Sequence, residues 1–408
     1  MKVRITDTVD WVGYVDWELR SFHGKEYSTH RGTSYNAYVV REEKTVLIDT
    51  VWAPYDQGFV ENLDREVGLA NLDAVVMNHS EVDHSGALPE LLRRIPNVPV
   101  YCTEAGARIL KGLYHEDWNF VTVKTGDSLD VGNGKKLVFV EMKMLHWPDS
   151  MASYLTGDAV LFSNDAFGQH YASASHFDDA VDDAELMAEA LKYYANILTP
   201  FSPLVVNKIR EVLALGLPIA RIAPSHGVIW RKDPTRIVGK YLEWAQDYRE
   251  HQATVLYDTM WDGTRRLADR IAEGLRAEDP TLVVKLFNVS KTDKNDVISE
   301  VFKSEAILAG SPTINRGIST AMAAILEEIE GLRFKGKKAA AFGTYGWSGE
   351  GVAKLNGLLA KAGFALVGEG LKALWNPDDA AQAKAVALGR EVAKAVRGDA
   401  GAAEPEHP

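Results

Sequence analysis

The sequence has very little cysteine: Cys102 is the single one among 408 residues. One thiol excludes an internal disulfide framework and any iron–sulfur cluster held by cysteines of this chain alone. Long hydrophobic runs are also missing, since none approaches the length of a membrane span. The N-terminus lacks the apolar segment of a secretory signal, so we expect a cytoplasmic protein with no membrane partner.

Positive charge is outnumbered, with 45 Lys and Arg residues against 57 Asp and Glu residues and a net charge of −12. This balance argues against nucleic acid as a partner, although the total can conceal a local basic patch. The fractions of hydrophobic residues (46%) and charged residues (25%) are those of a soluble globular protein. A chain of this length exceeds one ordinary core, so two domains are expected.

The first 250 residues or so mix strands and helices. Apolar runs predict paired strands over 35–40 and 44–48. A hairpin is predicted over 153–156 and 159–162, with Gly157-Asp158 as its two-residue turn. Helices are expected over 54–67, 182–197 and 202–215, followed by a polar helix over 234–251 that could join two domains.

From residue 253 the pattern becomes a regular alternation of strands and helices. Strands are predicted over 253–257, 281–289, 306–309, 338–342 and 365–371. Helices are predicted over 264–275, 294–302, 317–329, 351–361 and 377–396. Such alternation predicts a doubly wound, parallel, five-stranded sheet. We therefore expect an α/β protein with one domain over 1–250, a second over 251–398, and a flexible tail over 399–408.

The segment 79–84, His-Ser-Glu-Val-Asp-His, puts four possible metal ligands in six residues, directly after a buried strand over 72–77. Because residues i and i+2 of an extended segment point the same way, His79 and Glu81 can reach one metal. Asp83 and His84, beyond a turn, can face a second. Packing alone has no use for so many ionisable groups beside a buried strand. Three more residues of ligand type follow at long intervals: His146, Asp165 and His226.

Seven ligands suit two metals that share one bridging carboxylate, for which Asp165 is the candidate. The three carboxylates and a bridging hydroxide would neutralise two divalent ions. Oxygen donors mixed with imidazole favour iron or manganese, whereas a zinc pair more often has His where Glu81 stands. His84 could instead turn away and only hydrogen-bond a ligand. Five other histidines lack ligand-type neighbours and are interpreted as surface or near-site residues: His23, His30, His115, His170 and His176.

A hydroxyl-bearing turn precedes the predicted helix at 264 and could cradle a phosphate, because helix N-termini favour negative charge. It is neither a Walker loop nor a Gly-x-Gly-x-x-Gly turn, and a plain N-cap is the alternative reading. Its residues are Thr259, Met260, Trp261, Asp262, Gly263 and Thr264.

Two further loops follow predicted parallel strands at the edge where such sheets bind ligands. Trp347 and Tyr345 could stack on a planar ring, and small neighbours would let backbone amides approach its edge. FMN fits these loops better than ATP. The loop residues are Ser311, Pro312, Thr313, Ile314 and Asn315 in one, and Tyr345, Gly346, Trp347, Ser348 and Gly349 in the other.

The C-terminal part thus resembles a flavodoxin, and the N-terminal part resembles a metallo-β-lactamase-like αββα sandwich. The His-x-His-x-Asp-His signature of that fold appears here with Glu81 in place of the second His. The fusion resembles the flavodiiron proteins, also called A-type flavoproteins or rubredoxin:oxygen oxidoreductases, and all seven ligand positions match. One departure is local: Asp262-Gly263 stands where flavodoxin phosphate loops have Gly-Asn.

The resemblance implies an enzyme with a non-haem diiron centre and FMN, and no catalytic residues beyond the metal ligands. Such enzymes reduce dioxygen to water, nitric oxide to nitrous oxide, or both, usually with electrons from rubredoxin and as head-to-tail homodimers. The chain resembles the minimal two-domain class. The sequence leaves open the preferred gas, the identity of the donor and any oligomer beyond a dimer. Two other readings stay open: a zinc hydrolase with a flavodoxin module, and an electron carrier on an inactive scaffold.

Overall fold

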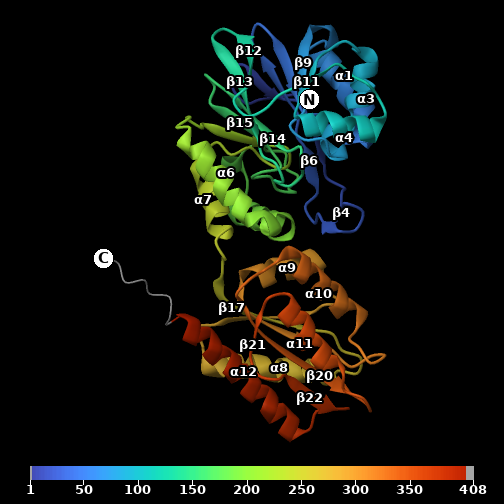
Figure 1. The fold of residues 1–408 in the computed structure, drawn as a ribbon, viewed down its shortest axis with the longest axis vertical. Coiled ribbons are helices and arrows are strands. Elements are labelled where there is room, and N and C mark those ends of the chain that lie inside the picture. The colour runs from blue at the N-terminus through green and yellow to red at the C-terminus, as the bar shows by residue number, and fades with distance from the viewer. Residues whose placement is uncertain (1, 401–408) are drawn as a thin grey trace, which may run out of the picture. The chain divides into compact units, whose positions relative to one another are not determined.

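The computed structural model describes residues 2–400. Contacts divide the chain into two compact units, shown in Figure 1. The first runs up to Tyr194 and again over Phe201–Ala245, and the second comprises Ala195–Pro200 and the chain from Gln246 onward. Within residues 2–400, none of the helices combines the length and hydropathy that a membrane crossing requires. Of the tail expected over 399–408, the first two residues continue the last helix, and 401–408 lie outside the described residues.

The first unit contains a seven-stranded sheet in the order β1-β2-β7-β8-β9-β10-β11. The predicted pairing of the strands near 40 and 46 is confirmed, since β7 and β8 run antiparallel. From β8 onward the neighbours are parallel. The strands are β1 (Val3–Arg4), β2 (Val9–Trp11), β7 (Tyr38–Arg41), β8 (Thr45–Ile48), β9 (Leu72–Val76), β10 (Val100–Cys102) and β11 (Phe120–Thr122).

A second, five-stranded sheet has the order β12-β13-β14-β15-β16. The predicted hairpin is confirmed by the antiparallel pair β14 and β15. Its loop spans the four residues 156–159, however, so the predicted two-residue turn Gly157-Asp158 was too short. Alternate apolar side chains of the two sheets, such as Val40, Ile48 and Phe139, are fully buried in one shared core. The strands are β12 (Ser128–Gly132), β13 (Lys135–Glu141), β14 (Met151–Leu155), β15 (Val160–Asn164) and β16 (Arg221–Pro224).

Helices cover both outer faces of this pair of sheets, which gives the predicted αββα sandwich. In Figure 1, α1 (Asp56–Glu66), α3 (Leu88–Arg94) and α4 (Glu104–Tyr114) lie on one side. On the other side lie α6 (Ser202–Ala214) and α7 (Pro234–Trp244), with α5 (Asp183–Tyr193) before them in the chain. The helix predicted over 234–251 was too long: it ends at the buried Trp244, and residues 250–251 already belong to the next strand.

Two short two-stranded sheets lie outside the main sheets. They pair β3 (Tyr14–Asp16) with β6 (Thr33–Tyr35) and, between them in the chain, β4 (Ser21–Phe22) with β5 (Tyr27–Ser28). Neither was predicted, because their strands have two or three residues and leave no period to detect.

The second unit is a doubly wound sheet in the order β18-β17-β19-β20-β21, with β22 also beside β20 and every pair parallel. This order has the first strand inside and the second at the edge, as in flavodoxins. The strands are β17 (Glu250–Tyr257), β18 (Val283–Asn288), β19 (Ser304–Gly310), β20 (Lys338–Tyr345), β21 (Ala365–Leu366) and β22 (Leu371–Leu374).

Five helices cover the two faces of this sheet (Figure 1). Apolar residues of α8 and α12 share one core with alternate residues of β17, β19 and β20. The remaining three helices pack in series, α9 against α10 and α10 against α11. The helices are α8 (Gly263–Glu278), α9 (Lys294–Lys303), α10 (Thr320–Leu332), α11 (Gly351–Lys361) and α12 (Asp379–Ala400).

The last strand differs from its prediction. A single strand was expected over 365–371, but β21 and β22 are separated by a break at 367–370. Gly368 (φ 68°) and Gly370 (φ 87°) adopt the left-handed region there, which only glycine reaches without strain. The break moves the end of the strand to Leu374, so Trp375 emerges at the carboxyl edge of the sheet.

Candidate metal and flavin sites

The seven predicted metal ligands all lie at or near strand ends of the first unit. His79 and Glu81 follow β9, and the one-turn helix α2 (Val82–Ser85) carries Asp83 and His84. His146 lies in the loop between β13 and β14, Asp165 directly follows β15, and His226 lies two residues after β16. Both sheets thus contribute metal-ligand candidates: the seven-stranded sheet through the segment after β9, and the five-stranded sheet through the loops after β13, β15 and β16.

Asp49 and Thr50, the two residues that follow β8, hold the segment 79–84 in place at its two ends. Asp49 accepts hydrogen bonds from the backbone amide of Asn78 at 2.7 Å and from its side chain at 3.1 Å. Thr50 donates its hydroxyl to the carbonyl oxygen of His84 at 2.6 Å. Burial raises the pKa of Asp49 to about 6, despite the opposing charge of His84. Neither residue was flagged from the sequence, because nothing local marks them as neighbours of the segment.

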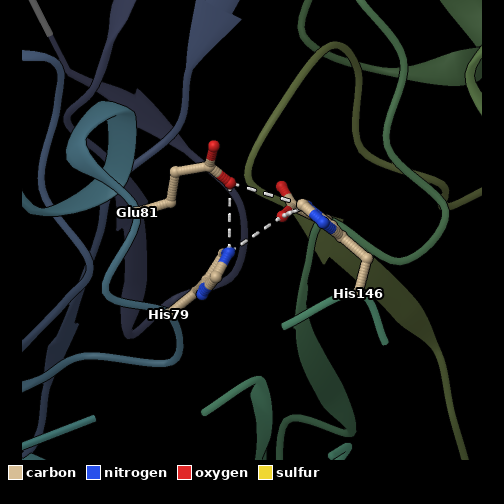
Figure 2. Close-up of side chains that lie close together, drawn as sticks. His79, Glu81 and His146 are labelled. Atoms are coloured by element: carbon tan, nitrogen blue, oxygen red, sulfur yellow. Dashed lines mark hydrogen bonds and ion pairs between the residues drawn. The ribbon is translucent and has the colours of Figure 1, made fainter. Parts of the chain in front are cut away.

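The first group of ligands is His79, Glu81, His146 and Asp165. Figure 2 shows His79, Glu81 and His146 directed toward one another. The Nε2 atom of His79 lies 3.3 Å from Oε2 of Glu81 and 3.7 Å from Oδ2 of Asp165. The Nε2 atom of His146 lies 3.6 Å and 3.2 Å from the same two oxygens.

The second group is Asp83, His84 and His226. The Nε2 atoms of His84 and His226 lie 3.3 Å and 3.0 Å from Oδ2 of Asp83. The same two nitrogens lie 3.1 Å and 3.6 Å from Oδ1 of Asp165. Asp165 therefore turns one oxygen to each group, as a bridging carboxylate does.

These distances fit metal ligands better than hydrogen-bonded pairs. A metal that binds nitrogen and oxygen at about 2.1 Å holds neighbouring ligands about 3.0–3.4 Å apart, close to the spacings found here. His84 is buried, and neither of its ring nitrogens has a hydrogen-bond partner among the described residues. Oδ1 of Asp83 is likewise buried without a partner in this part of the chain. Ligation would satisfy the Nε2 of His84, and four imidazoles with three carboxylates are the donor set that a pair of iron ions takes.

The carboxylates and imidazoles of the cluster shift one another's pKa values strongly. Burial alone would raise the pKa of Asp165, but the facing imidazoles of His84 and His146 hold it well below its usual range. Burial lowers the pKa of His84, yet the charges of Asp83 and Asp165 outweigh this and raise it to about 9. Asp165 therefore stays ionised, as metal ligation requires.

Outer hydrogen bonds orient two of the imidazoles. Nδ1 of His79 lies 3.1 Å from Oδ2 of Asp149, which is 2% exposed. His79 and Ser80 overcome the effect of burial and hold the pKa of Asp149 below its usual range, so this carboxylate accepts and His79 donates. Nδ1 of His226 donates to the carbonyl oxygen of Ser34 at 2.7 Å. Asp149 was not predicted, because nothing in the sequence marks it beyond its place three residues after His146.

The other histidines take different places. His23 lies at the tip of the β4–β5 hairpin, with Nε2 2.9 Å from Oε1 of Glu81. The buried ring of His170 lies 4.7 Å from that of His226. The ring of His176 packs edge-on against Trp11 at 4.3 Å. His30 and His115 are exposed.

In the second unit, the three predicted flavin loops meet at the carboxyl edge of the sheet around a cavity of about 640 Å³. Ten predicted residues line it: Met260, Trp261, Gly263, Pro312, Thr313, Asn315, Tyr345, Gly346, Trp347 and Ser348. Six do not: Thr259, Asp262, Thr264, Ser311, Ile314 and Gly349.

Three further residues that were not predicted also line the cavity: Arg316, Thr344 and Trp375. Trp375 was missed because the last strand was placed too early in the chain. Arg316 lies one residue beyond the predicted loop, and Thr344 lies in β20, which continues three residues beyond the predicted end of the strand at 342.

The turn before α8 suits a phosphate better than a plain N-cap. Asp262 precedes the helix in the left-handed region (φ 64°) and gives no side-chain hydrogen bond to it. Its carboxylate lies 3.1 Å from Nε of Arg265 instead. The Thr259 hydroxyl is buried and has no partner among the described residues, and the hydroxyls of Thr264 and Thr344 lie 2.9 Å apart. A bound phosphate would satisfy such hydroxyls and the first amides of the helix.

Comparison with known proteins assigns both units. The family model "ODP family beta lactamase" matches residues 33–227, and the flavodoxin model matches 255–389. An "anaerobic nitric oxide reductase flavorubredoxin" of Vibrio vulnificus is 54% identical over 395 residues, which are 97% of this chain and 80% of the relative. The one of Aeromonas hydrophila is 53% identical with the same coverage.

Solved structures match over nearly the whole chain. The rubredoxin oxygen:oxidoreductase of Desulfovibrio gigas has a TM-score of 0.95 at 34% identity, with 98% of this chain and 100% of that chain covered. The flavodiiron protein of Giardia intestinalis has a TM-score of 0.93 at 31% identity, with 99% of each chain covered.

Proposed function

Because this chain belongs to the flavodiiron protein family, we propose that it reduces nitric oxide to nitrous oxide at a diiron centre, with electrons passed on by FMN. The chain is an oxidoreductase of this family, with a metallo-β-lactamase-like domain and a flavodoxin-like domain. One observation carries the proposal: six ligand-type side chains, from the segment 79–84 and from the loops that carry His146 and His226, meet around the carboxylate of a seventh, Asp165. The iron domain would comprise residues 1–250, and the flavin domain residues 251–398.

In this proposal His79, Glu81 and His146 would hold one iron, and Asp83, His84 and His226 would hold the other. Asp165 would be a ligand shared by both. When bound, the two irons supply open positions and electrons for the reduction of diatomic gases. His84 is thereby assigned as a ligand rather than an outer partner, because its buried nitrogens have no other partner in the described chain.

Side chains around the ligands orient them and keep water away. His23 donates to Oε1 of Glu81, which leaves Oε2 facing His79 and His146. The apolar ring of Phe22, in the same hairpin, lies 5.8 Å from the ring of His226. A dry, fixed ligand shell of this kind controls the access of solvent to the site.

In the flavin domain, the loops around the 640 Å³ cavity would bind FMN. The phosphate would lie against Thr259, Thr264 and the start of α8. Tyr345, Trp347 and the unpredicted Trp375 would flank the flavin ring. The exposed fractions of Trp347 and Trp375, 95% and 70%, leave their faces available for stacking.

Nitric oxide is favoured as substrate because the relatives named as nitric oxide reductases share 52–54% of their residues with this chain. Reduction of dioxygen to water is the second candidate. It is supported by the 34% identical rubredoxin oxygen:oxidoreductase, which matches the chain at a TM-score of 0.95. Two irons and one flavin can hold four electrons, enough for dioxygen, whereas joining two nitric oxide molecules needs two.

We further propose that rubredoxin supplies the electrons and that the chain works as a head-to-tail homodimer. The donor is supported by the name of the Desulfovibrio gigas match. The dimer is supported by the location of the two candidate cofactor sites in separate units, since a two-fold dimer is the commonest way to bring sites of two copies together.

Stopped-flow oxidation tests the substrate. Iron and FMN are first quantified, and the reduced enzyme is then mixed with each gas while nitrous oxide is measured by gas chromatography. We expect about two irons and one FMN per chain, and faster oxidation by nitric oxide with one nitrous oxide per two molecules consumed. Faster oxidation by dioxygen would favour the second candidate, and enzyme that contains only zinc would contradict both.

A further inference from the structure

We propose that Asp149 is the positioning residue of the metal centre. It holds His79 with Nε2 toward the ions and fixes the loop that carries His146 against the segment that carries His79. The inference deepens the proposed function and rests on the ligand assignment made there.

The contact with His79 decides which ring nitrogen is free to bind metal. The backbone amide of Ser80 lies 3.1 Å from Nδ1 of His79 but only 2.7 Å from Oδ2 of Asp149, so it donates mainly to the carboxylate. Nδ1 of His79 is then the donor in its own 3.1 Å contact with Oδ2. Nε2 is then left unprotonated, and it is the atom that lies 3.3 Å from Glu81 and 3.7 Å from Asp165. A carboxylate behind a metal-bound imidazole fixes its tautomer and orientation and makes it a stronger ligand.

The same carboxylate connects two ligand-bearing segments. Oδ2 of Asp149 also accepts the backbone amide of Ser80 at 2.7 Å, so it binds two consecutive residues of the segment after β9. Asp149 itself follows His146 by three residues in the loop before β14. Its carbonyl oxygen accepts the hydroxyl of Thr103 at 3.2 Å, which holds this loop from a third side. One buried side chain therefore sets the distance between His79 and His146.

The two metal positions are not supported alike. His226 donates to the neutral carbonyl of Ser34, and Nδ1 of His84 has no hydrogen-bond partner within residues 2–400. Among His79, His84 and His226, only His79 has its Nδ1 atom in contact with a carboxylate of the described residues. Loss of Asp149 should therefore weaken the His79 position and leave the His84 and His226 position largely unchanged.

Two substitutions separate the hydrogen bond from the charge. In Asp149→Asn the amide oxygen can keep both contacts of Oδ2, and the amide nitrogen would take the place of Oδ1, which has no partner in the described chain. Asp149→Ala removes both contacts. The matched control is Ser150→Ala, which changes the next residue of the loop, where Oγ accepts the amide of Trp147 at 3.2 Å without touching His79.

The experiment uses the FMN-loaded protein in the oligomeric state in which it is purified. Competition with a chelator measures its affinity for ferrous iron, and Mössbauer spectra are recorded on the iron-loaded protein. We expect Asp149→Ala to lower affinity at one of the two positions by about 10- to 100-fold, leaving about one tightly bound iron per chain. Asp149→Asn should keep two irons, with a change in only one of the two quadrupole doublets. Ser150→Ala should match the parent.

Three results would overturn the inference. The first is that both Asp149 variants bind two irons with parental affinity and unchanged doublets. The second is that Asp149→Asn and Asp149→Ala lose the same iron affinity. The third is that Ser150→Ala loses as much iron affinity as Asp149→Ala. If Asp149→Ala does not fold, the spectrum of Asp149→Asn still decides, since an unchanged doublet contradicts the contact with His79. A parent protein without two irons would instead refute the proposed function.

Discussion

Oδ1 of Asp165 lies 3.1 Å from Nε2 of His84. The other oxygen of the same carboxylate lies 3.2 Å from Nε2 of His146, in the opposite ligand group. Asp165 is 3% exposed, and each of its oxygens faces an imidazole, with Oδ1 also accepting the hydroxyl of Ser225 at 2.9 Å. One side chain at the end of β15 thus joins the two halves of the candidate centre.

Asp165→Ala should therefore empty both metal positions, whereas loss of a terminal ligand affects one. We expect well under one iron per chain and a fall in nitric oxide reduction by more than about 100-fold, beyond the upper end for outer partners of metal ligands. Iron is measured by elemental analysis and activity with a nitric oxide electrode. Asp117→Ala, at an exposed acidic residue of the same unit, is the control and should match the parent. Retention of two irons by Asp165→Ala would contradict the bridging role.

His84→Ala tests whether His84 binds metal or only supports a ligand. Its ring is 1% exposed, Nδ1 has no partner among the described residues, and Nε2 faces the carboxylates of Asp83 and Asp165 at 3.3 Å and 3.1 Å, as a ligand of the second group would. We expect iron to fall to about one per chain, with FMN content unchanged. If His84→Leu, which keeps an apolar side chain in the space, retained two irons, His84 would be a packing residue.

Thr259→Val tests the phosphate cradle. The buried hydroxyl of Thr259 has no partner among residues 2–400, and a hydrogen bond to a charged group contributes about 1.5–3 kcal/mol. We expect the dissociation constant of FMN to rise about 10- to 100-fold, as measured by quenching of flavin fluorescence in the apoprotein. Riboflavin, which lacks the phosphate, is the matched ligand, and its affinity should not change. An equal loss for both ligands would place the effect on the ring instead.

Lys337 makes the stability of the flavin domain depend on pH. Burial lowers its pKa to about 7, and its ammonium donates to the carbonyl oxygens of Phe302 and Ser304. Between pH 7 and about 10.5 the unfolded chain binds a proton that the folded chain does not, so stability rises with pH in this window. The slope from this one group is at most about 1.4 kcal/mol per pH unit.

Lys337→Met should remove that slope, because methionine fills similar space without a charge. Hydrogen exchange of amides in β19 and β20 between pH 7 and 9.5 measures it, and the parent should gain stability over the variant as pH rises. Lys335→Met, at an exposed position two residues earlier, should show the pH dependence of the parent. A constant difference between parent and Lys337→Met across this range would contradict the prediction.

Much of the fold followed from local pattern. Short apolar runs that alternate with helical patterns from residue 253 onward predicted a parallel sheet, because parallel strands are buried on both faces and are joined by helices. The prediction failed where special backbone conformations decide. Gly368 and Gly370 break the last strand, and Asp247 (φ 53°) turns the chain three residues after Trp244, where the predicted helix was to continue.

The sequence by itself determined which chemistry is available: imidazoles and carboxylates in a six-residue cluster, and hydroxyl and aromatic loops after strands. It could not decide which distant residues support them. Asp149, Asp49 and Trp375 became visible only in three dimensions, because each acts through a contact with a residue far away in the chain or through a break in a strand. Side-chain type is local information, whereas the direction in which a lone pair or ring faces is set by tertiary packing.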